Sequence, residues 1–355
     1  MTRASLVAAL VLCAATASAQ SNLRNARLES RPGTDLAGTF QTLSNTAGPI
    51  WIAYAVPAQD PEWNACCYEN GRQGRCRLEE GRSSGTPATG SDPRGPIHLE
   101  AGSQVMVLYR VESQAVGRIR AFSDSCELDA DGASVHWLTG VTTPASLELL
   151  QRLASRPVAD GERRDRVVDG ALLAISAHRD AAADRILAAF MAADQPMGTR
   201  KQAAFWAANA RGRAGFELTR AALLDTSNAE SFRKHLTFVV SQSRDAEAVD
   251  TLTRVAKQDA SATVRGEAIF WLAQKAGQKA ARAITDAIAN DPETKVKEKA
   301  VFALSQLPKD EGVPKLIEVA RDNRNPAVRK QAMFWLGQSR DPRALAFFEQ
   351  VLARP

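Results

Sequence analysis

The chain has 355 residues, of which 45% are apolar and 24% charged, a composition that is typical of folded proteins and excludes a wholly disordered one. The charge is divided unevenly: residues 20–150 hold 11 basic and 15 acidic residues, whereas residues 151–355 hold 33 basic and 25 acidic ones. This basic half predicts contact with an anionic envelope polymer, an acidic protein or nucleic acid, or attraction between the two halves.

Residues 1–19 are predicted to be a signal peptide. Arg3 precedes a short apolar run, and small residues form a cleavage pattern before Gln20. Neither this run nor any later one reaches the ~20 apolar residues of a membrane-spanning helix. We therefore expect a bacterial protein that is periplasmic or secreted, which excludes nucleic acid as a partner. A lipid anchor on Cys13 is the rival interpretation, although Leu12 stands where lipoprotein signals have a small residue.

The four cysteines that remain after removal of the signal peptide all lie before residue 130. An even number in an exported chain predicts two disulfides. Because adjacent cysteines seldom bond to each other, we expect one of the pair to reach the third cysteine and the other to reach the fourth, in either combination. A zinc site made by the first three of these cysteines and His98 is the alternative, but the paired-cysteine spacing of zinc sites is absent. The four residues are Cys66, Cys67, Cys76 and Cys126.

Residues 20–143 are predicted to form a β-rich domain. Seven short segments alternate or cluster β-branched and aromatic residues between turn-forming residues, which is typical of an antiparallel sandwich or a small barrel. A stretch rich in Gly, Ser, Pro and Arg at 57–96 is expected to be a surface excursion. The predicted strands are residues 27–31, 39–43, 50–56, 97–100, 104–112, 116–122 and 134–138.

Acidic residues near the end of this domain suggest two structures. Glu127, Asp129, Asp131 and Gly132 have the spacing of the first half of a calcium loop, but Leu138 stands where the closing carboxylate is needed. Asp131-Gly132 is more simply a hairpin turn. We therefore expect neither a metal nor a cofactor.

Residues 144–355 change to helical periodicity and contain a repeat. Six similar windows start 32, 33, 32, 32 and 32 residues apart, and further predicted helices lie between them. Such a unit buries its apolar face only by stacking on its neighbours, so we expect an α-solenoid of about six repeats. The windows are residues 167–178, 199–210, 232–243, 264–275, 296–307 and 328–339.

The repeats resemble the HEAT repeat family in its short bacterial form. The resemblance depends on an Asp that ends one helix, followed by Val-Arg and then Ala in the next helix; the earlier copies depart from it. It implies a ladder of hydrogen bonds between stacked repeats, with the second helix of each pair facing the partner. The ladder residues, expected to be structural rather than ligand-binding, are Arg200, Arg233, Arg265, Lys297, Arg329, Asp259, Asp291 and Asp322.

One aromatic position of the repeat does not lie on the helix face that is predicted to be buried, which we call the buried stripe. At about 100° per residue, Ala268 and Trp271 fall near Val264, whereas Phe270 falls almost opposite. Either these rings wedge between adjacent second helices, or they line an exposed groove suited to a protein partner. The five candidate binding residues are Phe205, Phe238, Phe270, Phe302 and Phe334.

The sequence contains no catalytic signature: it has no Ser elbow, no paired His on a helix and no phosphate-binding Gly loop. The prediction is therefore a non-catalytic exported scaffold that binds another protein, in the cell envelope, through the solenoid groove. The alternative is a structural or anionic-polymer-binding envelope protein, and the distant alternative is an enzyme of the bilin-lyase type. Residues 341–355 form a helix that is apolar round most of its circumference, which suggests a homodimer contact.

Overall fold

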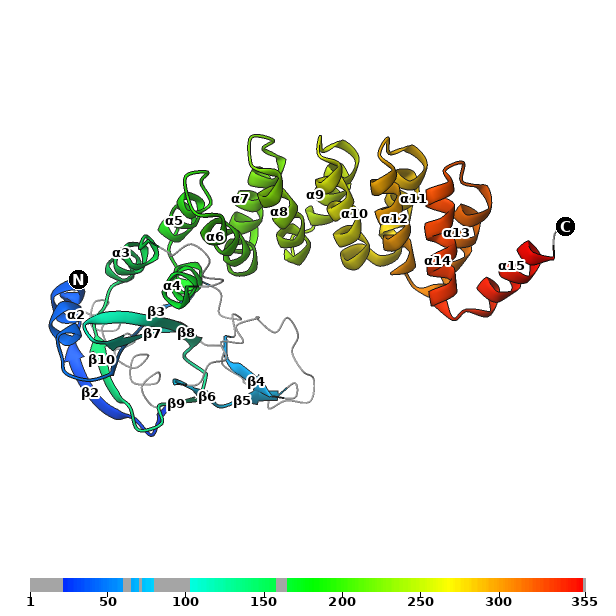
Figure 1. Cartoon of the computed structure of the whole chain (residues 1–355). Helices are drawn as coiled ribbons and strands as arrows, with labels where there is room; N and C mark the ends of the chain where they lie inside the picture. The colour runs from blue at the N-terminus through cyan, green and yellow to red at the C-terminus, as the bar shows by residue number, and fades with distance from the viewer. Residues whose placement is uncertain (1–21, 60–64, 70–71, 80–102, 158–164, 354–355) are drawn as a thin grey trace, which may run out of the picture. The chain divides into compact units, whose positions relative to one another are not determined.

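The computed structural model describes residues 22–59, 65–69, 72–79, 103–157 and 165–353 (Figure 1). The predicted signal peptide, the predicted strand at 97–100 and His98 lie outside these residues. The chain divides into two compact units, Met1–Arg211 and Gly212–Pro355. Compactness therefore groups the first helices after residue 143 with the β-rich part of the chain.

A mixed five-stranded sheet lies at the centre of the first unit, in the order β2-β10-β3-β7-β8. Strand β10 pairs in parallel with β2 and β3, and only the β3-β7-β8 part is antiparallel. The predicted all-antiparallel pairing is therefore wrong, because β10 runs parallel to both of its neighbours, and the open strand order excludes the predicted barrel. The strands are β2 Arg27–Pro32, β3 Ile50–Pro57, β7 Gln104–Glu112, β8 Ala115–Ser123 and β10 Ser134–Thr139.

Both faces of this sheet are covered (Figure 1). A smaller parallel sheet of β1 (Leu23–Arg24), β9 (Leu128–Asp129) and β6 (Cys76–Arg77) shares a core with one face, through residues such as Trp51 and Trp137. Helices α2 (Leu36–Ser44), α3 (Thr143–Ala154) and α4 (Arg166–Ala177) cover the other face. Burial on both sides explains why β3 is an unbroken apolar run and not an alternating one.

The predicted strand at 39–43 is wrong, because these residues belong to helix α2. Asp35 caps this helix by accepting a hydrogen bond from the Gly38 amide at 3.0 Å. Leu36, Phe40 and Leu43 are buried at helical spacing. The β-branched Thr residues of the segment favour a strand, but the cap and the helical spacing of the apolar residues decide the local structure.

Two disulfides fix the region beside the small sheet. Cys66 bonds Cys126, and Cys67 bonds Cys76. This confirms the disulfide bonds and selects one of the two combinations that the sequence left open. Three of these cysteines were the ones considered for zinc, and disulfide bonding removes them as zinc ligands. A two-stranded hairpin of β4 (Cys67–Glu69) and β5 (Arg72–Gly74) begins at one of them.

The turn at Asp131-Gly132 is present, with positive φ angles of 49° and 80°. It does not close a hairpin, since β9 and β10, the strands on either side of it, belong to different sheets. The Asp129 carboxylate accepts hydrogen bonds from the Asn25 side chain and the Asp131 amide, both at 3.0 Å. Asp129 is thus engaged in holding the turn.

Helices fill the rest of the described chain. The first unit also contains α5 (Ala182–Phe190) and α6 (Met197–Ala210). The second unit consists of helix pairs in two layers (Figure 1). The aromatic layer is α8 (Glu230–Gln242), α10 (Ala262–Ala276), α12 (Thr294–Ser305) and α14 (Pro326–Ser339). The second layer is α7 (Gly212–Leu224), α9 (Ala248–Gln258), α11 (Ala281–Asn290) and α13 (Lys309–Asp322), and the short helix η1 (Gly277–Ala280) and α15 (Pro342–Leu352) complete the unit.

Small and branched residues hold these pairs together. On α10, Val264, Ala268 and Leu272 are completely buried. Their counterparts on α12, Val296, Ala300 and Leu304, are buried as well. The alanine in the middle of each helix lets neighbouring helices approach closely, and the branched residues on either side fill the space between the layers. This packing fixes which face of each aromatic-layer helix stays open.

Candidate functional site

A row of phenylalanines follows the open face of the aromatic layer. Phe238 on α8, Phe270 on α10 and Phe302 on α12 are half-buried, and Phe334 on α14 is 53% exposed. The fifth position of the predicted row, Phe205 on α6, is half-buried in the first unit. Because Phe205 belongs to the first unit, the candidate site consists of the four positions in the second unit.

Rings from successive helices touch one another in an unbroken series. The series also includes Trp271 and Trp335, both of which are half-buried. Helical phase predicts Trp271 among the buried residues, and this prediction is wrong, because the indole is half-buried. The rings pack between neighbouring helices and still keep part of their surface open. The centroid distances are 4.9 Å for Phe238–Trp271, 4.8 Å for Trp271–Phe270, 5.6 Å for Phe270–Phe302, 4.8 Å for Phe302–Trp335 and 5.0 Å for Trp335–Phe334.

The absence of a tryptophan from α12 explains why two phenylalanines stack directly in the middle of the series. The position of Trp271 and Trp335 is taken on α12 by Ala303, which is completely buried. With no indole on α12, the ring of Phe302 stacks directly on Phe270, with the two planes only 6° apart. The large-small-large alternation therefore leaves open space beside Phe302.

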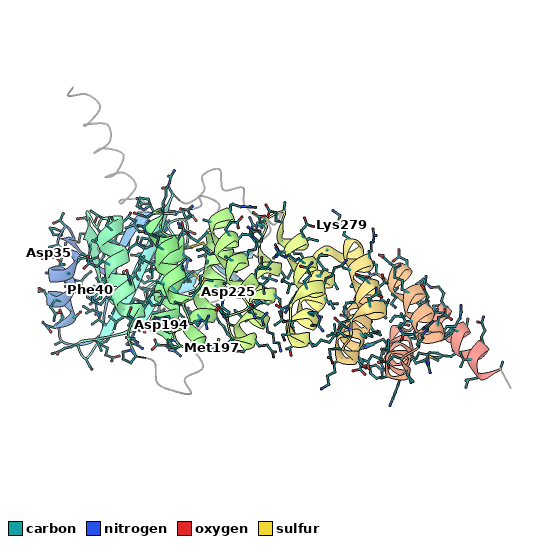
Figure 2. All side chains as sticks on the ribbon, turned by 90° about the horizontal axis from the view of Figure 1, so that it is seen from above. Asp35, Phe40, Asp194, Met197, Asp225 and Lys279 are labelled. Atoms are coloured by element: carbon teal, nitrogen blue, oxygen red, sulfur yellow. A yellow bond between two sulfur atoms is a disulfide. The ribbon has the colours of Figure 1, made fainter. Side chains whose placement is uncertain are left out.

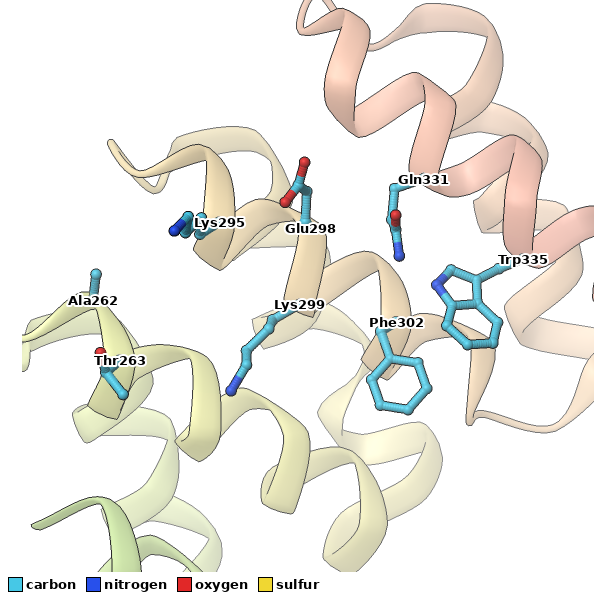
Figure 3. Close-up of a pocket in the computed structure, with 8 residues that line it drawn as sticks. All are labelled: Ala262, Thr263, Lys295, Glu298, Lys299, Phe302, Gln331 and Trp335. Atoms are coloured by element: carbon cyan, nitrogen blue, oxygen red, sulfur yellow. The ribbon is translucent and has the colours of Figure 1, made fainter. Parts of the chain in front are cut away.

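A groove of about 560 Å³ lies at this space (Figure 3). Phe302 and Trp335 form its aromatic wall, and Figure 3 shows both rings facing the hollow between α12 and α14. A cavity of this size accommodates one or two side chains of a bound peptide. The lining residues come from α10, α12 and α14 and are Ala262, Thr263, Lys295, Glu298, Lys299, Phe302, Gln331 and Trp335.

Most of these lining residues were not predicted. Apart from Ala262, they stand three, four or seven residues before the phenylalanine of their own helix, as Lys299, Glu298 and Lys295 do before Phe302. Residues at these separations share one face of a helix. That spacing was the signal from which the lining could have been predicted.

Charged side chains border the groove and are partly paired. Glu267 on α10 accepts from Lys299 at 2.5 Å and also pairs with Lys234 on α8 at 3.3 Å. These pairs join three neighbouring helices across the open face. Lys295 is exposed, and in the part of the chain that the structure describes it forms no ion pair.

The expected ladder residues form two rungs between helix pairs. Arg265 on α10 makes a bidentate ion pair with Asp291, the residue that follows α11, at 2.7 and 2.9 Å. Arg233 on α8 pairs with Asp259, the residue that follows α9. All four side chains are buried. Burial alone raises the pKa of Asp291, but hydrogen bonds from Arg265 and from the Glu293 amide outweigh it, so the pKa is lowered.

The remaining ladder residues make other contacts. Lys297 donates to the Ala289 carbonyl at 2.9 Å, and Asp322 is exposed, so the expected pair between them is replaced by a backbone contact. Arg329 donates to the Asn323 carbonyl at 2.8 Å. In the first unit Arg200 donates to the Met191 carbonyl at 2.9 Å. These contacts hold the start of one helix to the end of the helix before it.

Two cations that hold helix ends were missed. Arg211 donates to the His178 carbonyl at 2.5 Å and pairs with Asp184 at 2.7 Å. Lys275 donates to the carbonyls of Ser241 and Ser243, at 3.0 and 2.6 Å, and so joins α10 to the end of α8. Both lie near helix ends, where the repeat pattern varies, and nothing in the sequence distinguished them.

The first unit contains a buried chain of polar groups. The Tyr109 and Tyr54 hydroxyls lie 2.5 Å apart, Tyr54 lies 2.7 Å from the Ser146 hydroxyl, and Ser146 lies 2.7 Å from His178 Nε2. His178 Nδ1 lies 2.6 Å from the Ala174 carbonyl. That carbonyl can only accept, so Nδ1 is protonated and Nε2 accepts from Ser146. Ser146 and His178 are completely buried, so this pair joins α3 and α4 to the sheet and is not a nucleophile with its base.

We expect this buried series of hydrogen-bonded groups to make the stability of the first unit depend on pH. Burial lowers the pKa of His178 to about 4, whereas in the unfolded chain it is about 6.5. The unfolded state therefore binds more protons between these values, and stability falls by about 3 kcal/mol as the pH drops from 6.5 to 4. Unfolding free energies measured across this range should show that slope, and His178→Gln should lose it. An unchanged slope in the variant would assign it to other groups.

Within the described residues, no three side chains of the His, Cys, Asp or Glu type are grouped so as to hold a metal ion. None of the described helices is both long and apolar enough to cross a membrane. At the C-terminal helix α15, Leu345 and Leu352 are 61% and 85% exposed. The homodimer contact expected of this helix stays a prediction.

Comparison with known proteins identifies the C-terminal part of the chain. Residues 281–355 match the family model for HEAT repeats. No curated protein matches the chain. Two similar solved structures are human deoxyhypusine hydroxylase in complex with glycerol, at 19% identity over 55% of this chain and 74% of that one, and the complex of CpcE and CpcF of phycocyanin lyase from Nostoc sp. PCC7120, at 16% identity over 54% and 76%. Both have a TM-score of 0.31. The match over residues 281–355 confirms the HEAT repeats that the Asp, Val-Arg and Ala pattern predicted there.

Proposed function

We propose that this chain is a non-catalytic scaffold whose aromatic groove binds an extended segment of another protein. HEAT repeats suggest protein interaction as the general role. The observation that carries the proposal is the series of rings from Phe238 to Phe334, which stays half-exposed along four helices and opens into the groove beside Phe302. A contiguous exposed aromatic surface is costly in water unless a partner covers it.

The chemistry of the groove fits a peptide. Covering the open part of one phenylalanine ring contributes about 1 kcal/mol, so several rings in series supply useful affinity without a deep pocket. Thr263 and Gln331 add polar groups that can pair with a peptide backbone. An apolar wall with a few polar groups is the usual composition of such a site.

We also propose that the protein acts outside the cytoplasm, in the cell envelope or as a secreted protein. The two disulfides of the first unit support this, because such bonds persist in oxidising compartments. The partner would then be an envelope or extracellular protein.

The two alternatives have less support. An anionic polymer would use many cations at once, but several cations of the second unit are already engaged, among them Arg213, Arg233, Arg265 and Lys299. Binding that falls steeply with added salt would favour the polymer. For a lyase-type enzyme, the groove contains neither a cysteine nor a histidine among its lining residues.

Replacing Phe302 by serine should abolish partner binding and leave the fold intact. The ring is half-exposed, so the loss of stability should stay near 1–2 kcal/mol, whereas removing a central aromatic anchor weakens binding at least about 30-fold. A photo-crosslinking residue in place of Gln331 would first capture the partner segment in its native compartment. The affinity of that segment, made synthetically, would then be measured by fluorescence anisotropy.

Leu345→Ser is the matched control, because Leu345 is apolar and exposed but lies on α15, away from the groove. It should leave the affinity unchanged. If Phe302→Ser instead lowers the melting temperature strongly, the ring is a packing residue and the binding proposal is wrong. Equal affinity of both variants for the segment would also contradict it.

A further inference from the structure

The aromatic layer of the second unit has a larger excess of positive over negative residues than the second layer has. The four helices of the aromatic layer hold nine basic and three acidic residues, whereas the four helices of the second layer hold eight and seven. Two of the nine, Arg233 and Arg265, are neutralised by buried carboxylates. The cations that remain still outnumber the acids, so the open face favours an acidic occupant.

Helix α12 sets a distance between apolar and basic contacts. Lys299 and Lys295 precede Phe302 by three and seven residues and therefore lie on the same face, as Figure 3 shows. Lys299 is bonded to Glu267, which leaves Lys295 as the exposed cation at the end of the groove. At 1.5 Å per residue, Lys295 lies roughly 10 Å from Phe302 along the helix.

We propose that the groove selects segments in which an aromatic side chain and a carboxylate are three residues apart. This inference rests on the proposed function and specifies the partner's chemistry. A segment in the polyproline II conformation advances roughly 3.1 Å per residue and has three residues per turn, so side chains three residues apart lie on one face, roughly 9 Å apart, close to the roughly 10 Å between Phe302 and Lys295. The aromatic side chain enters beside Phe302 and Trp335, and the carboxylate meets Lys295.

Glu298 sharpens this selection. It lines the groove and precedes Phe302 by four residues, so it lies roughly 6 Å from it along the helix. A carboxylate placed one or two residues from the aromatic anchor would lie near Glu298 and be repelled. The groove therefore discriminates by spacing as well as by total charge.

An array of synthetic nine-residue peptides tests this with the full chain as the analyte. Each peptide has a central phenylalanine in a Gly/Ser background and one glutamate, which is moved through every position on either side. We expect the highest affinity at a separation of three and the lowest at one or two. The best peptide should bind about fivefold more tightly than its glutamine counterpart, the upper range for one exposed ion pair.

A charge-reversal variant assigns the contact. Lys295→Glu should weaken the best glutamate peptide about tenfold and strengthen its lysine counterpart, because attraction becomes repulsion. Lys279→Glu is the matched control: the same charge change at an exposed residue of η1, outside the groove lining (Figure 2). It should leave both affinities unchanged.

The outcomes separate the two levels of the proposal. If all phenylalanine peptides bind alike, whatever the position of the glutamate, the spacing rule is overturned and the proposed function stands. Equal effects of Lys295→Glu and Lys279→Glu would overturn the contact with Lys295 in the same way. If polyglutamate without any aromatic residue binds as tightly as the best peptide, both the rule and the proposed peptide groove are wrong, and the face binds anionic polymers.

Discussion

Arg265→Met should lower the free energy of local unfolding of α10–α12 by about 3–5 kcal/mol, because it leaves the Asp291 carboxylate buried without its partner. In the native chain this carboxylate accepts two hydrogen bonds from Arg265 at 2.7 and 2.9 Å, and both side chains are buried. Methionine keeps most of the apolar stem of arginine, so the loss reports the charge and not the packing. Native-state hydrogen exchange measures it helix by helix.

Lys297→Met is the matched control, since Lys297 occupies the same position on the next helix but donates only to the Ala289 carbonyl. Its cost should stay below about 1 kcal/mol. The double variant Arg265→Met, Asp291→Asn should recover part of the loss, because no charge is then buried alone. Equal costs for Arg265→Met and Lys297→Met would show that the rung adds nothing beyond the packing of the side chains.

Gly170→Ala should destabilise the first unit by at least about 3 kcal/mol. A Cβ atom on Gly170 would lie 2.2 Å from the carbonyl oxygen of Ile119, so helix α4 could not keep its place on strand β8. Alanine is by itself about 1 kcal/mol better than glycine within a helix, so any loss must come from this contact. Thermal unfolding followed by near-ultraviolet circular dichroism, with the disulfides intact, measures the change.

Gly266→Ala is the matched control. The nearest atoms to the added Cβ atom all belong to the Lys299 side chain, with Cδ closest at 2.8 Å, and that flexible side chain can move aside. We expect a change within about 1 kcal/mol, with the better helix propensity of alanine offsetting the contact. A comparable loss at both glycines would mean that α4 shifts on the sheet without difficulty.

The helices were predictable from the sequence because their packing is local. Each one repeats the same apolar spacing, and the predicted window at 264–275, for example, lies within α10, Ala262–Ala276. The β-rich part was harder, because its architecture depends on pairings between distant residues. The parallel register of β2 with β10 joins residues about a hundred positions apart, which no local pattern reveals.

Two local patterns in the β-rich part indicated the correct structure, but the prediction followed the β-branched residues and the turns instead. The unbroken apolar run Ile50–Val56 is typical of a strand that is covered on both faces, which argues against a sheet with one wet side. Asp35 followed by Leu36, Phe40 and Leu43 is a capped amphipathic helix. β-branched residues in the segment favoured a strand, and the cap decided otherwise.

The candidate site was predictable in position and not in detail. Helical phase placed Phe270 away from the buried stripe, and it is half-buried on the open face. The phase of Trp271 suggested burial, but the indole is wider than the stripe and extends to the phenylalanine row. The groove itself depends on Ala303, whose effect appears only when the rings of three helices are seen together.

The rungs of the ladder end before the groove does. Arg265 and Asp291 form the last of the two, whereas Lys297 and Arg329 contact only backbone carbonyls at the end of the preceding helix. In a linear array each unit is held only by its neighbours, so we expect the helices after Asp291, which no buried ion pair of this ladder joins, to open more easily than those before it. Phe302 and Trp335 lie on these helices, α12 and α14. A ligand that contacts both rings would link α12 to α14, and its binding should therefore slow hydrogen exchange in these two helices.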